Sequence, residues 1–341
     1  MEFSTIEDIR DKYGPDGISQ YELSEGVALI SDDTQMTLFT ATGLLLGTTR
    51  GRMRGLMAPY YTYVGHSYQT WLLTQTRTYP LPEDESIYSW LAHVPELFSR
   101  RAPGNTCLSA IATGEFGTIE QPLNQSKGCG GVMRVAPLGL YHTTDLDGAK
   151  VAALTHGHEL GYIPAATLVH IIRCLALENL SVEQAVASAR AATQRLFPQA
   201  RHLPDLLSLL DKAAELAAAD LDDATCIGHL GEGWVAEETL AIAVYCALKY
   251  PDDFDRALRA AVNHSGDSDS TGAVTGNILG AHLGLKGIPA KYQEHLELRE
   301  IILEIATDLC RDCPNEEYAP LQDESWNEKY FSLTYTPVSA L

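Results

Sequence analysis

Apolar residues recur at intervals of three and four along most of the chain, which is the spacing of one face of an α-helix. This pattern predicts helices over four long segments: 181–197, 203–220, 235–250 and 295–310. Ser181 and Gln184 form a capping pair at the start of the first segment. Glycine and proline separate the helical segments, and alternating strand patterns joined by hairpin turns are missing. We therefore predict an all-α fold.

The same pattern contains no low-complexity linker and no repeat of fixed period, so we predict a compact single domain over residues 1–341. Periodicity weakens from about residue 315, and residues 315–341 are predicted to form a C-terminal tail on the surface. No run of about 18 apolar residues suggests a membrane span. The first residues also lack the basic and apolar regions of a signal peptide.

Composition narrows the class of partner. Lys and Arg number 24 against 45 Asp and Glu, a formal net charge of −21, which repels phosphate backbones and argues against a nucleic-acid partner. Seven scattered cysteines, an odd number, indicate reduced thiols and a cytoplasmic protein. Cys310 and Cys313 form a lone CxxC pair, which we interpret as thiols that pack a helix, with zinc binding and redox chemistry as the alternatives.

Two short stretches rich in acids and hydroxyls each precede a helical apolar pattern. They contribute six oxygen-bearing side chains: Ser31, Asp32 and Asp33, then Asp267, Asp269 and Ser270. Each stretch alone fits a helix N-cap, because Ser and Asp accept hydrogen bonds from first-turn amides and acids complement the helix dipole. Together they supply more oxygen than two caps require, since one cap needs one side-chain oxygen.

A fold that joined the two helix starts would place four carboxylates side by side, and unneutralised like charges at short range are costly. Mg²⁺ and Mn²⁺ would neutralise the group, because both ions favour carboxylate, hydroxyl and water oxygens. We therefore predict a centre of two divalent cations, Mg²⁺ or Mn²⁺. Such a centre can orient hydroxyl-bearing substrates and lower the pKa of a bound water.

A rival hypothesis concerns the second acidic stretch. Residues 267–271 also fit the DxDx[ST] pattern of phosphatases that form an aspartyl-phosphate. That chemistry needs an apolar strand before the motif and a parallel sheet behind it. The preceding segment, 256–266, has no such pattern, so the hypothesis is weak.

A glycine-rich segment lies near the middle of the chain. Gly128, Gly130 and Gly131 fall within four positions and precede Met133 and Arg134. Glycines let backbone amides approach an anion, so the segment is a candidate phosphate cradle, with a flexible turn as the alternative. Arg134 would either pair with a phosphate or brace the acidic cluster.

His156 and His158 stand two positions apart in front of another apolar run. Two metal ligands on one helix face need a spacing of three or four, so the pair is not a helical metal site. We expect one of them to hydrogen-bond a ligand and the other to be structural.

Six segments, taken in order, resemble the ADP-ribosylglycohydrolase family, which includes the dinitrogenase-reductase-activating glycohydrolases. They cover nearly the whole chain and occupy residues 31–45, 103–111, 126–140, 154–162, 233–248 and 263–285. The resemblance implies a compact orthogonal bundle of helices with two Mg²⁺ or Mn²⁺ ions. It also implies cleavage of the bond between the anomeric carbon of ADP-ribose and an acceptor such as an arginine side chain.

Carried over by position, the resemblance implies that both acidic stretches ligate metal, through Ser31, Asp32, Asp33, Asp267, Asp269 and Ser270. Serine replaces a commoner threonine and keeps an oxygen ligand. The diphosphate and adenosine side would be contacted by Lys127, Gly128, Cys129, Gly130, Gly131, Met133 and His156.

The resemblance also implies catalytic roles for Glu2, Asp33 and Asp269, and Glu2 falls on a family glutamate near the metals. The family ordinarily has a helix before this glutamate, whereas this chain starts at Met1. Three explanations stay open: a misassigned start, a helix replaced by something else in the chain, and a protein that binds its ligand but turns it over poorly.

From these observations we expect metal-dependent hydrolysis of ADP-ribose from an ADP-ribosylated arginine side chain of a protein. One alternative is an ADP-ribose-binding protein with weak catalysis. Another is a hydrolase of a different ADP-ribosyl linkage, to serine or in a small molecule such as O-acetyl-ADP-ribose. The presence of both acidic stretches favours the enzyme. The sequence leaves the oligomeric state open.

Overall fold

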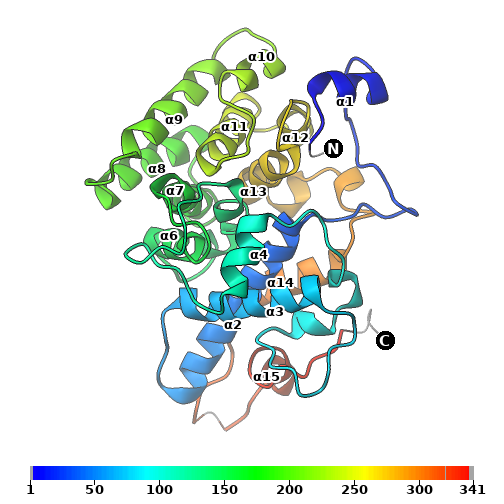
Figure 1. Cartoon of the computed structure of the whole chain (residues 1–341), viewed down its shortest axis with the longest axis vertical. Coiled ribbons are helices and arrows are strands. Elements are labelled where there is room, and N and C mark those ends of the chain that lie inside the picture. The colour runs from blue at the N-terminus through cyan, green and yellow to red at the C-terminus, as the bar shows by residue number, and fades with distance from the viewer. Residues whose placement is uncertain (1–2, 319, 338–341) are drawn as a thin grey trace.

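Helices make up nearly all the regular structure in the computed structural model of the chain, which describes residues 3–318 and 320–337 (Figure 1). The α-helices are α1 (Ile6–Tyr13), α2 (Asp32–Arg54), α3 (Tyr60–Thr76), α4 (Asn105–Ala112), α5 (Ala136–Gly139), α6 (Asp145–Ala153), α7 (Glu159–Ala176), α8 (Val182–Leu196), α9 (Leu203–Ala217), α10 (Asp223–Gly228), α11 (Ala236–Lys249), α12 (Phe254–Val262), α13 (Ser268–Gly287), α14 (Arg299–Arg311) and α15 (Glu324–Tyr330). Short 3₁₀ helices are η1 (Trp90–His93), η2 (Pro95–Leu97), η3 (Cys129–Gly131) and η4 (Ala290–Tyr292). Strand-like pairing in these residues is limited to isolated bridges. The all-α prediction is confirmed.

The four helices predicted from periodicity correspond to α8, α9, α11 and α14. The capping pair at the start of α8 is present, with the Ser181 hydroxyl accepting from the Gln184 amide and the Gln184 side chain accepting from the Ser181 amide. Helix α14 starts later than predicted. Leu298 has a left-handed backbone with φ of 56°, and the residues before it pair with Ala28, so the helix begins at Arg299.

Helix α2 lies at the centre of the fold and is buried along most of its length. It packs against α3, α5, α13, α14 and α15, so apolar residues occur around its whole circumference rather than on one face. Gly43 permits the close crossing with α3, because a Cβ there would lie only 2.8 Å from the Cα of Val64. This arrangement fixes the start of α2, at Asp32, deep inside the molecule.

Helix α7 is long and apolar enough to cross a membrane by length and composition, although the sequence pattern suggested no such span. However, 78% of its residues are buried within the fold. Helices α6, α8, α11 and α13 surround it, and its side chains belong to the apolar cluster that runs from Ile30 to Tyr330. Core packing therefore accounts for its composition.

The prediction of a surface tail after residue 315 is wrong for α15. Trp326 is 2% exposed, and its indole Nε1 donates to Thr49 Oγ1 of α2 at 2.9 Å. The buried Tyr330 hydroxyl donates to Asp308 of α14 at 2.7 Å. This helix shows weak periodicity because it has seven residues, yet it completes the core around α2.

The first helix lies beside the loop that leads into α13, although more than 200 residues separate them (Figure 1). The Ile6 amide donates to Ser265 Oγ at 3.0 Å, and the Ile18 amide donates to Asn263 Oδ1 at 2.6 Å. The N-terminal segment is therefore held against the second acidic stretch. Glu2, one of the predicted catalytic residues, lies outside the described residues.

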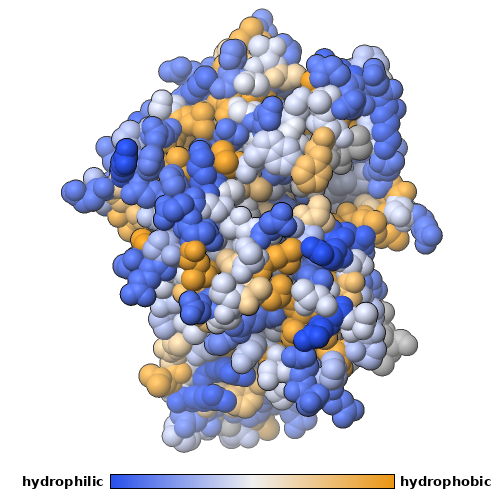
Figure 2. Space-filling model, viewed as in Figure 1, coloured by the Kyte–Doolittle hydropathy of each residue, from blue (hydrophilic) through white to orange (hydrophobic). Residues whose placement is uncertain are grey.

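The surface is mainly polar, and Figure 2 shows apolar residues scattered over one face without a continuous band. All seven cysteines are free thiols. Cys313 is buried, and its thiol contacts the Asn315 carbonyl. Cys310 is exposed on the last turn of α14, so the packing interpretation of the CxxC pair applies only to Cys313.

Candidate metal centre and ligand pocket

The two acidic stretches meet at the starts of two packed helices. Helix α2 begins at Asp32 and α13 begins at Ser268, and the two helices contact each other. Both N-terminal ends open into one pocket of about 150 Å³. Its lining residues are Asp32, Asp33, Ala102, Gly104, Asn105, Thr106, Cys107, Gly128, Cys129, Gly130, Met133, His156, Asp267, Asp269 and Ser270.

The carboxylates in this pocket are close enough to share cations. One oxygen from each of Asp32, Asp33 and Asp269 lies within 4.8 Å of the others. Asp267 and Ser270 line the same pocket. Ser31 does not line it, and its hydroxyl donates to Asp33 Oδ2 at 3.3 Å, next to the cluster.

Helix capping explains only part of this arrangement. Asp267 is the N-cap of α13 and accepts from the Ser270 amide at 3.2 Å. Ser31, the N-cap of α2, makes no side-chain capping bond. Asp33 and Asp269 each bury one Oδ1 atom that has no hydrogen-bond partner among the described residues. Buried polar atoms are normally paired, so these two oxygens need another partner.

The electrostatics of the site indicate that its carboxylates lack a counter-charge. Burial and then the charges of Asp269, Asp32 and Asp267 raise the pKa of Asp33 well above its usual value. Burial and the interaction with Asp269 raise the pKa of Asp267 to about 8. Burial and the nearby Asp267 raise the pKa of the Cys129 thiol, which keeps it protonated.

Divalent cations fit this set of residues. Asp32, Asp33, Asp267 and Asp269 offer carboxylate oxygens, and Ser270 offers a hydroxyl, which are the donors that Mg²⁺ and Mn²⁺ favour. The unpartnered oxygens of Asp33 and Asp269 are the atoms that bound cations would satisfy. The donor set therefore suits the hard cations suggested by the sequence.

The glycine-rich segment forms a second wall of the pocket. Gly128, Cys129, Gly130 and Met133 line it. The segment just before α11 holds this wall in place, because the Cys129 amide donates to the Trp234 carbonyl at 3.2 Å. The wall adjoins the acidic cluster, because the charge of Asp267 adds to burial in raising the pKa of the Cys129 thiol.

Two predicted residues of the segment do not line the pocket. Gly131 faces α7, where a Cβ would lie 2.4 Å from the Gly161 carbonyl oxygen, so helix packing requires a glycine there. Lys127 forms an ion pair with Glu237 on the first turn of α11. The Ala236 amide also donates to the Lys127 carbonyl at 2.9 Å. Lys127 therefore ties the wall to α11.

Arg134 is an internal brace. It is fully buried, and its guanidinium lies over the Tyr68 ring at 4.5 Å from the centroid. Its Nη2 donates to Thr155 Oγ1 at 2.6 Å and its Nη1 contacts the sulfur atoms of Met36 and Cys107. Because the side chain is fully buried, the phosphate-pairing alternative does not fit, and the charge acts from beneath the pocket.

The structure separates the roles of the two histidines. His156 is 2% exposed and lines the pocket, where burial and then the charge of Arg134 lower its pKa to about 3. His158 is the N-cap of α7, and its Nδ1 accepts from the Leu160 amide at 3.0 Å. His156 therefore lines the pocket and His158 caps a helix, while the expected hydrogen bond to a ligand stays a prediction.

Sequence reasoning assigned no role to the third wall. Its residues lie at and before the start of α4: Ala102, Gly104, Asn105, Thr106 and Cys107. Gly104 is the N-cap of α4. The sequence feature that could have indicated this helix start was a glycine and an asparagine in front of a short apolar run. The sequence also offered no reason to single out Thr155, the partner of Arg134, because one threonine in a helical pattern has no distinctive spacing.

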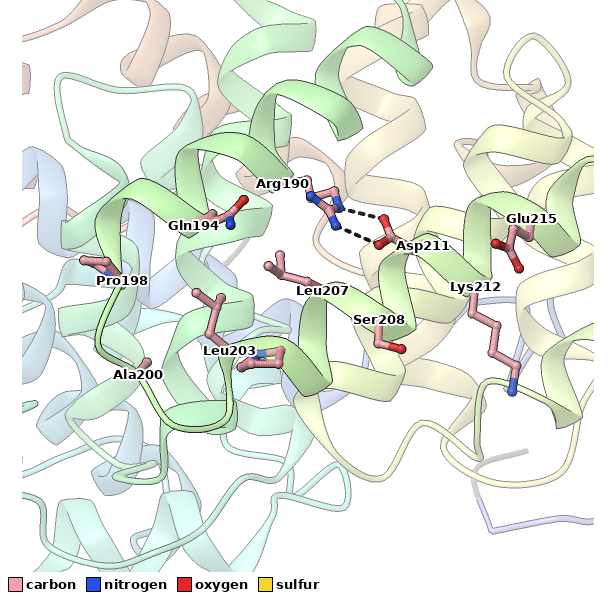
Figure 3. Close-up of a pocket in the computed structure, with 11 residues that line it drawn as sticks. Arg190, Gln194, Pro198, Ala200, Leu203, Leu207, Ser208, Asp211, Lys212 and Glu215 are labelled. Atoms are coloured by element: carbon pink, nitrogen blue, oxygen red, sulfur yellow. Dashed lines mark hydrogen bonds and ion pairs between the residues drawn. The ribbon is translucent and has the colours of Figure 1, made fainter.

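Two other features do not compete with this site. Residues 267–271 follow α12 and open α13, so the strand and sheet that phosphatase chemistry requires are missing from the described residues around the motif. A wider groove of about 830 Å³ lies between α8 and α9, where Arg190 and Asp211 pair through two hydrogen bonds (Figure 3). That groove contains no residue of the acidic cluster.

The chain is similar to several known proteins. The human protein named ADP-ribosylhydrolase ARH3 is 29% identical over 203 residues, which cover 50% of this chain and 54% of that protein. The Danio rerio protein of the same name is 26% identical over 308 residues, which cover 80% of this chain and 75% of that protein. A solved chain described as an ADP-ribosylglycohydrolase-related protein complex is 24% identical, with a TM-score of 0.49 over 82% of this chain and 98% of that one.

The chain spans about half the length of the mammalian relatives it matches. A family profile gives the broadest match, because the profile described as ADP-ribosylglycohydrolase matches residues 1–318. This region contains both acidic stretches and all three walls of the pocket. The chain therefore belongs to the ADP-ribosylglycohydrolase family.

Proposed function

We propose that this protein is a divalent-cation-dependent hydrolase that cleaves the glycosidic bond between ADP-ribose and an arginine side chain of a modified protein. The proposal rests on the pocket where two acidic stretches, more than 200 residues apart, meet. There, buried carboxylate oxygens have no partner in the described part of the chain. Family membership supports a substrate that contains ADP-ribose. Mg²⁺ or Mn²⁺ would be held by Asp32, Asp33, Asp267, Asp269 and Ser270.

Hydrolysis of this bond requires a water oxygen to bond to the anomeric carbon while the carbon–nitrogen bond to the guanidine breaks. The electron pair of the broken bond stays on the nitrogen, so the cationic guanidinium leaves as a neutral guanidine. The guanidine then takes up the proton that the attacking water has lost. Bound divalent cations would supply positive charge that orients ribose hydroxyls and lowers the pKa of water. An oxocarbenium-like transition state is expected, as in other glycosidic cleavages.

The protein's own groups would position the substrate and move the protons. Asp33, which lines the pocket, would accept a proton from the attacking water through a carboxylate oxygen that is not committed to a cation. Glu2, beyond the described part of the chain, is the further candidate for proton transfer. Gly128 and Gly130 leave room for the diphosphate and adenosine side of the ligand along the wall of the pocket.

We assign arginine as the acceptor side chain because of its positive charge. A guanidinium group is cationic, and the protein that would receive it has a net charge of −21. Serine-linked ADP-ribose and O-acetyl-ADP-ribose lack this cation in the leaving group. They would therefore gain less from the acidic surroundings.

The test is release of ADP-ribose from an arginine-ADP-ribosylated protein with Mg²⁺, with Mn²⁺ and with EDTA. We expect release with either cation and none with EDTA. Asp269→Asn should lower turnover by at least about 100-fold because it removes a carboxylate at the reacting centre. Asp211→Asn, the same chemical change in the exposed ion pair of Figure 3, should leave turnover intact.

Four results would contradict parts of the proposal. Equal release of ADP-ribose in EDTA, or full activity of Asp269→Asn, would contradict the proposed cation centre. Release only from the serine-linked substrate would support the hydrolase activity but show that the acceptor is serine rather than arginine. Cation-dependent ADP-ribose binding without any release would instead identify a binding protein.

A further inference from the structure

Three buried side chains connect the centre of the fold to the pocket. Arg134 Nη2 donates to Thr155 Oγ1 at 2.6 Å, and Thr155 Oγ1 lies 2.8 Å from His156 Nδ1. The three side chains are 0%, 1% and 2% exposed, respectively. The chain of contacts ends at the imidazole that lines the pocket.

Counting hydrogens in this chain determines the direction of each bond. A guanidinium only donates, so Thr155 Oγ1 must accept from Arg134. The threonine has one hydroxyl hydrogen, and within residues 3–318 and 320–337 its only other side-chain partner is His156 Nδ1. If Nδ1 carried the hydrogen, the buried hydroxyl hydrogen would have no acceptor, which buried polar groups avoid. Thr155 therefore donates to Nδ1.

With Nδ1 as an acceptor, the hydrogen of a neutral imidazole must lie on Nε2. Burial, together with the positive charge of Arg134, lowers the pKa of His156 and so disfavours a second proton on the ring. His156 is therefore a donor with a fixed direction.

The position of Nε2 gives this donor a target. A Cβ at Gly128 would lie 3.4 Å from His156 Nε2, and one at Gly130 would lie 3.2 Å from it. The nitrogen thus faces the glycine wall, and side chains at these positions would cover it. Among the described residues, Nε2 has no hydrogen-bond partner of its own. An acceptor in the pocket would supply one.

We propose that Arg134 and Thr155 act as positioning residues that hold His156 as a neutral imidazole with its hydrogen on Nε2, where it donates to an oxygen of the bound ligand. Arg134 cannot touch that ligand, because it is fully buried. The identity of the ligand as ADP-ribose rests on the proposed function, whereas the tautomer of His156 does not.

The first measurement is the tautomer itself, by ¹⁵N–¹H correlation spectra of the whole protein labelled with [¹⁵N]histidine. The chain has eleven histidines, and the spectrum of His156→Gln identifies the signal of interest. At neutral pH we expect a protonated Nε2 and an unprotonated Nδ1. A hydrogen on Nδ1, or on both nitrogens, would overturn the proposal, and this result needs no variant of Thr155.

The second measurement compares Thr155→Val with Thr155→Ser. Valine removes the hydroxyl and nearly keeps the shape, whereas serine keeps the hydroxyl. In Thr155→Val we expect a mixture of His156 tautomers and roughly tenfold weaker binding of ADP-ribose in the presence of Mg²⁺ by calorimetry. Thr155→Ser should retain the wild-type spectrum. An unchanged tautomer in Thr155→Val would overturn the role of Thr155.

A matched control separates this effect from general loss of a buried hydroxyl. Thr167 of α7 is also fully buried, and its Oγ1 contacts Thr193 Oγ1 at 2.9 Å, away from the pocket. Thr167→Val should leave both the His156 spectrum and ADP-ribose binding unchanged. If wild type fails to bind ADP-ribose, the proposed function is wrong, while the spectrum still decides the tautomer.

Discussion

Asp33 and Asp269 each keep a carboxylate oxygen buried beside other carboxylates, and neither oxygen has a partner in the described part of the chain. Burying such a group without a partner costs free energy, and like charges at short range add to the cost. A chain that tolerates this arrangement at two helix starts, where one ordinary cap would suffice, sacrifices stability for binding. At the level of single residues, these unsatisfied oxygens are therefore the feature that supports the proposed cation site.

Gly130 is the residue whose replacement tests the glycine wall. A Cβ at this position would lie 2.8 Å from Cys107 Sγ and 2.9 Å from His156 Cε1, closer than real Cβ contacts allow. Gly130→Ala should therefore displace one of these groups, cost about 1–3 kcal/mol of unfolding free energy and weaken ADP-ribose binding. Urea unfolding and calorimetry measure the two effects.

The control for this substitution is Gly276→Ala in α13, where a Cβ would meet no heavy atom within 4 Å. Alanine is the better helix former, so this variant should gain about 0.5–1 kcal/mol of stability and keep its ligand affinity. Wild-type affinity in Gly130→Ala would show that the wall does not contact the ligand.

At the level of whole elements, the seven-residue helix α15 explains why periodicity failed near the C-terminus. Seven residues give too few repeats for a helical pattern, although Trp326 and Tyr330 are buried. Trp326→Ala should lower the unfolding free energy by about 3–5 kcal/mol, because it removes a large buried side chain from the surface of α2. Leu321→Ala, at an 87% exposed position of the same segment, should change it by less than about 0.5 kcal/mol. Urea denaturation separates these outcomes, and equal effects would contradict a core role for α15.

The contact between α6 and α7 should depend on pH through Asp145. Partial burial alone would raise the pKa of this carboxyl, but the hydrogen bond and charge of His170, at 2.7 Å, and the charge of Arg173 outweigh burial and lower the pKa. A lowered pKa in the folded state means that the unfolded chain binds the proton more tightly. The stabilisation is therefore present above the ordinary Asp value of about 3.9 and is lost as pH falls through the folded value.

Asp145→Asn removes this contribution and should cost about 1 kcal/mol at pH 7. The difference from wild type should shrink toward zero between about pH 4 and pH 2, below the ordinary pKa of Asp. Thermal unfolding of both proteins across this range is the measurement. A difference that stays constant with pH would show that Asp145 acts through packing rather than charge.

Across the molecule, the sequence predicted the positions of helices better than the long-range contacts between them. Strong periodicity located α8, α9 and α11, while the left-handed Leu298 that delays α14 carries no compositional signal. For the site, the paired acidic stretches pointed to a shared centre because their oxygen count exceeded what caps need. The wall from α4 and the contacts of Arg134 depend on long-range packing, which residue spacing does not encode.

The protein as a whole should be stabilised by divalent cations, because ions that bind only the folded state shift unfolding by mass action. At a cation concentration about 100 times the dissociation constant, this linkage supplies about 2.7 kcal/mol, or roughly 3–4 °C in Tm for a chain of this size. A net charge of −21 also predicts stabilisation by any salt through screening, so NaCl at equal ionic strength is the reference. In wild type and Asp211→Asn, we expect Mg²⁺ to raise Tm by more than NaCl does. In Asp269→Asn, this excess rise in Tm should disappear. An equal rise with NaCl would mean that Mg²⁺ acts on the surface charge, and an excess that survives in Asp269→Asn would place the cations elsewhere.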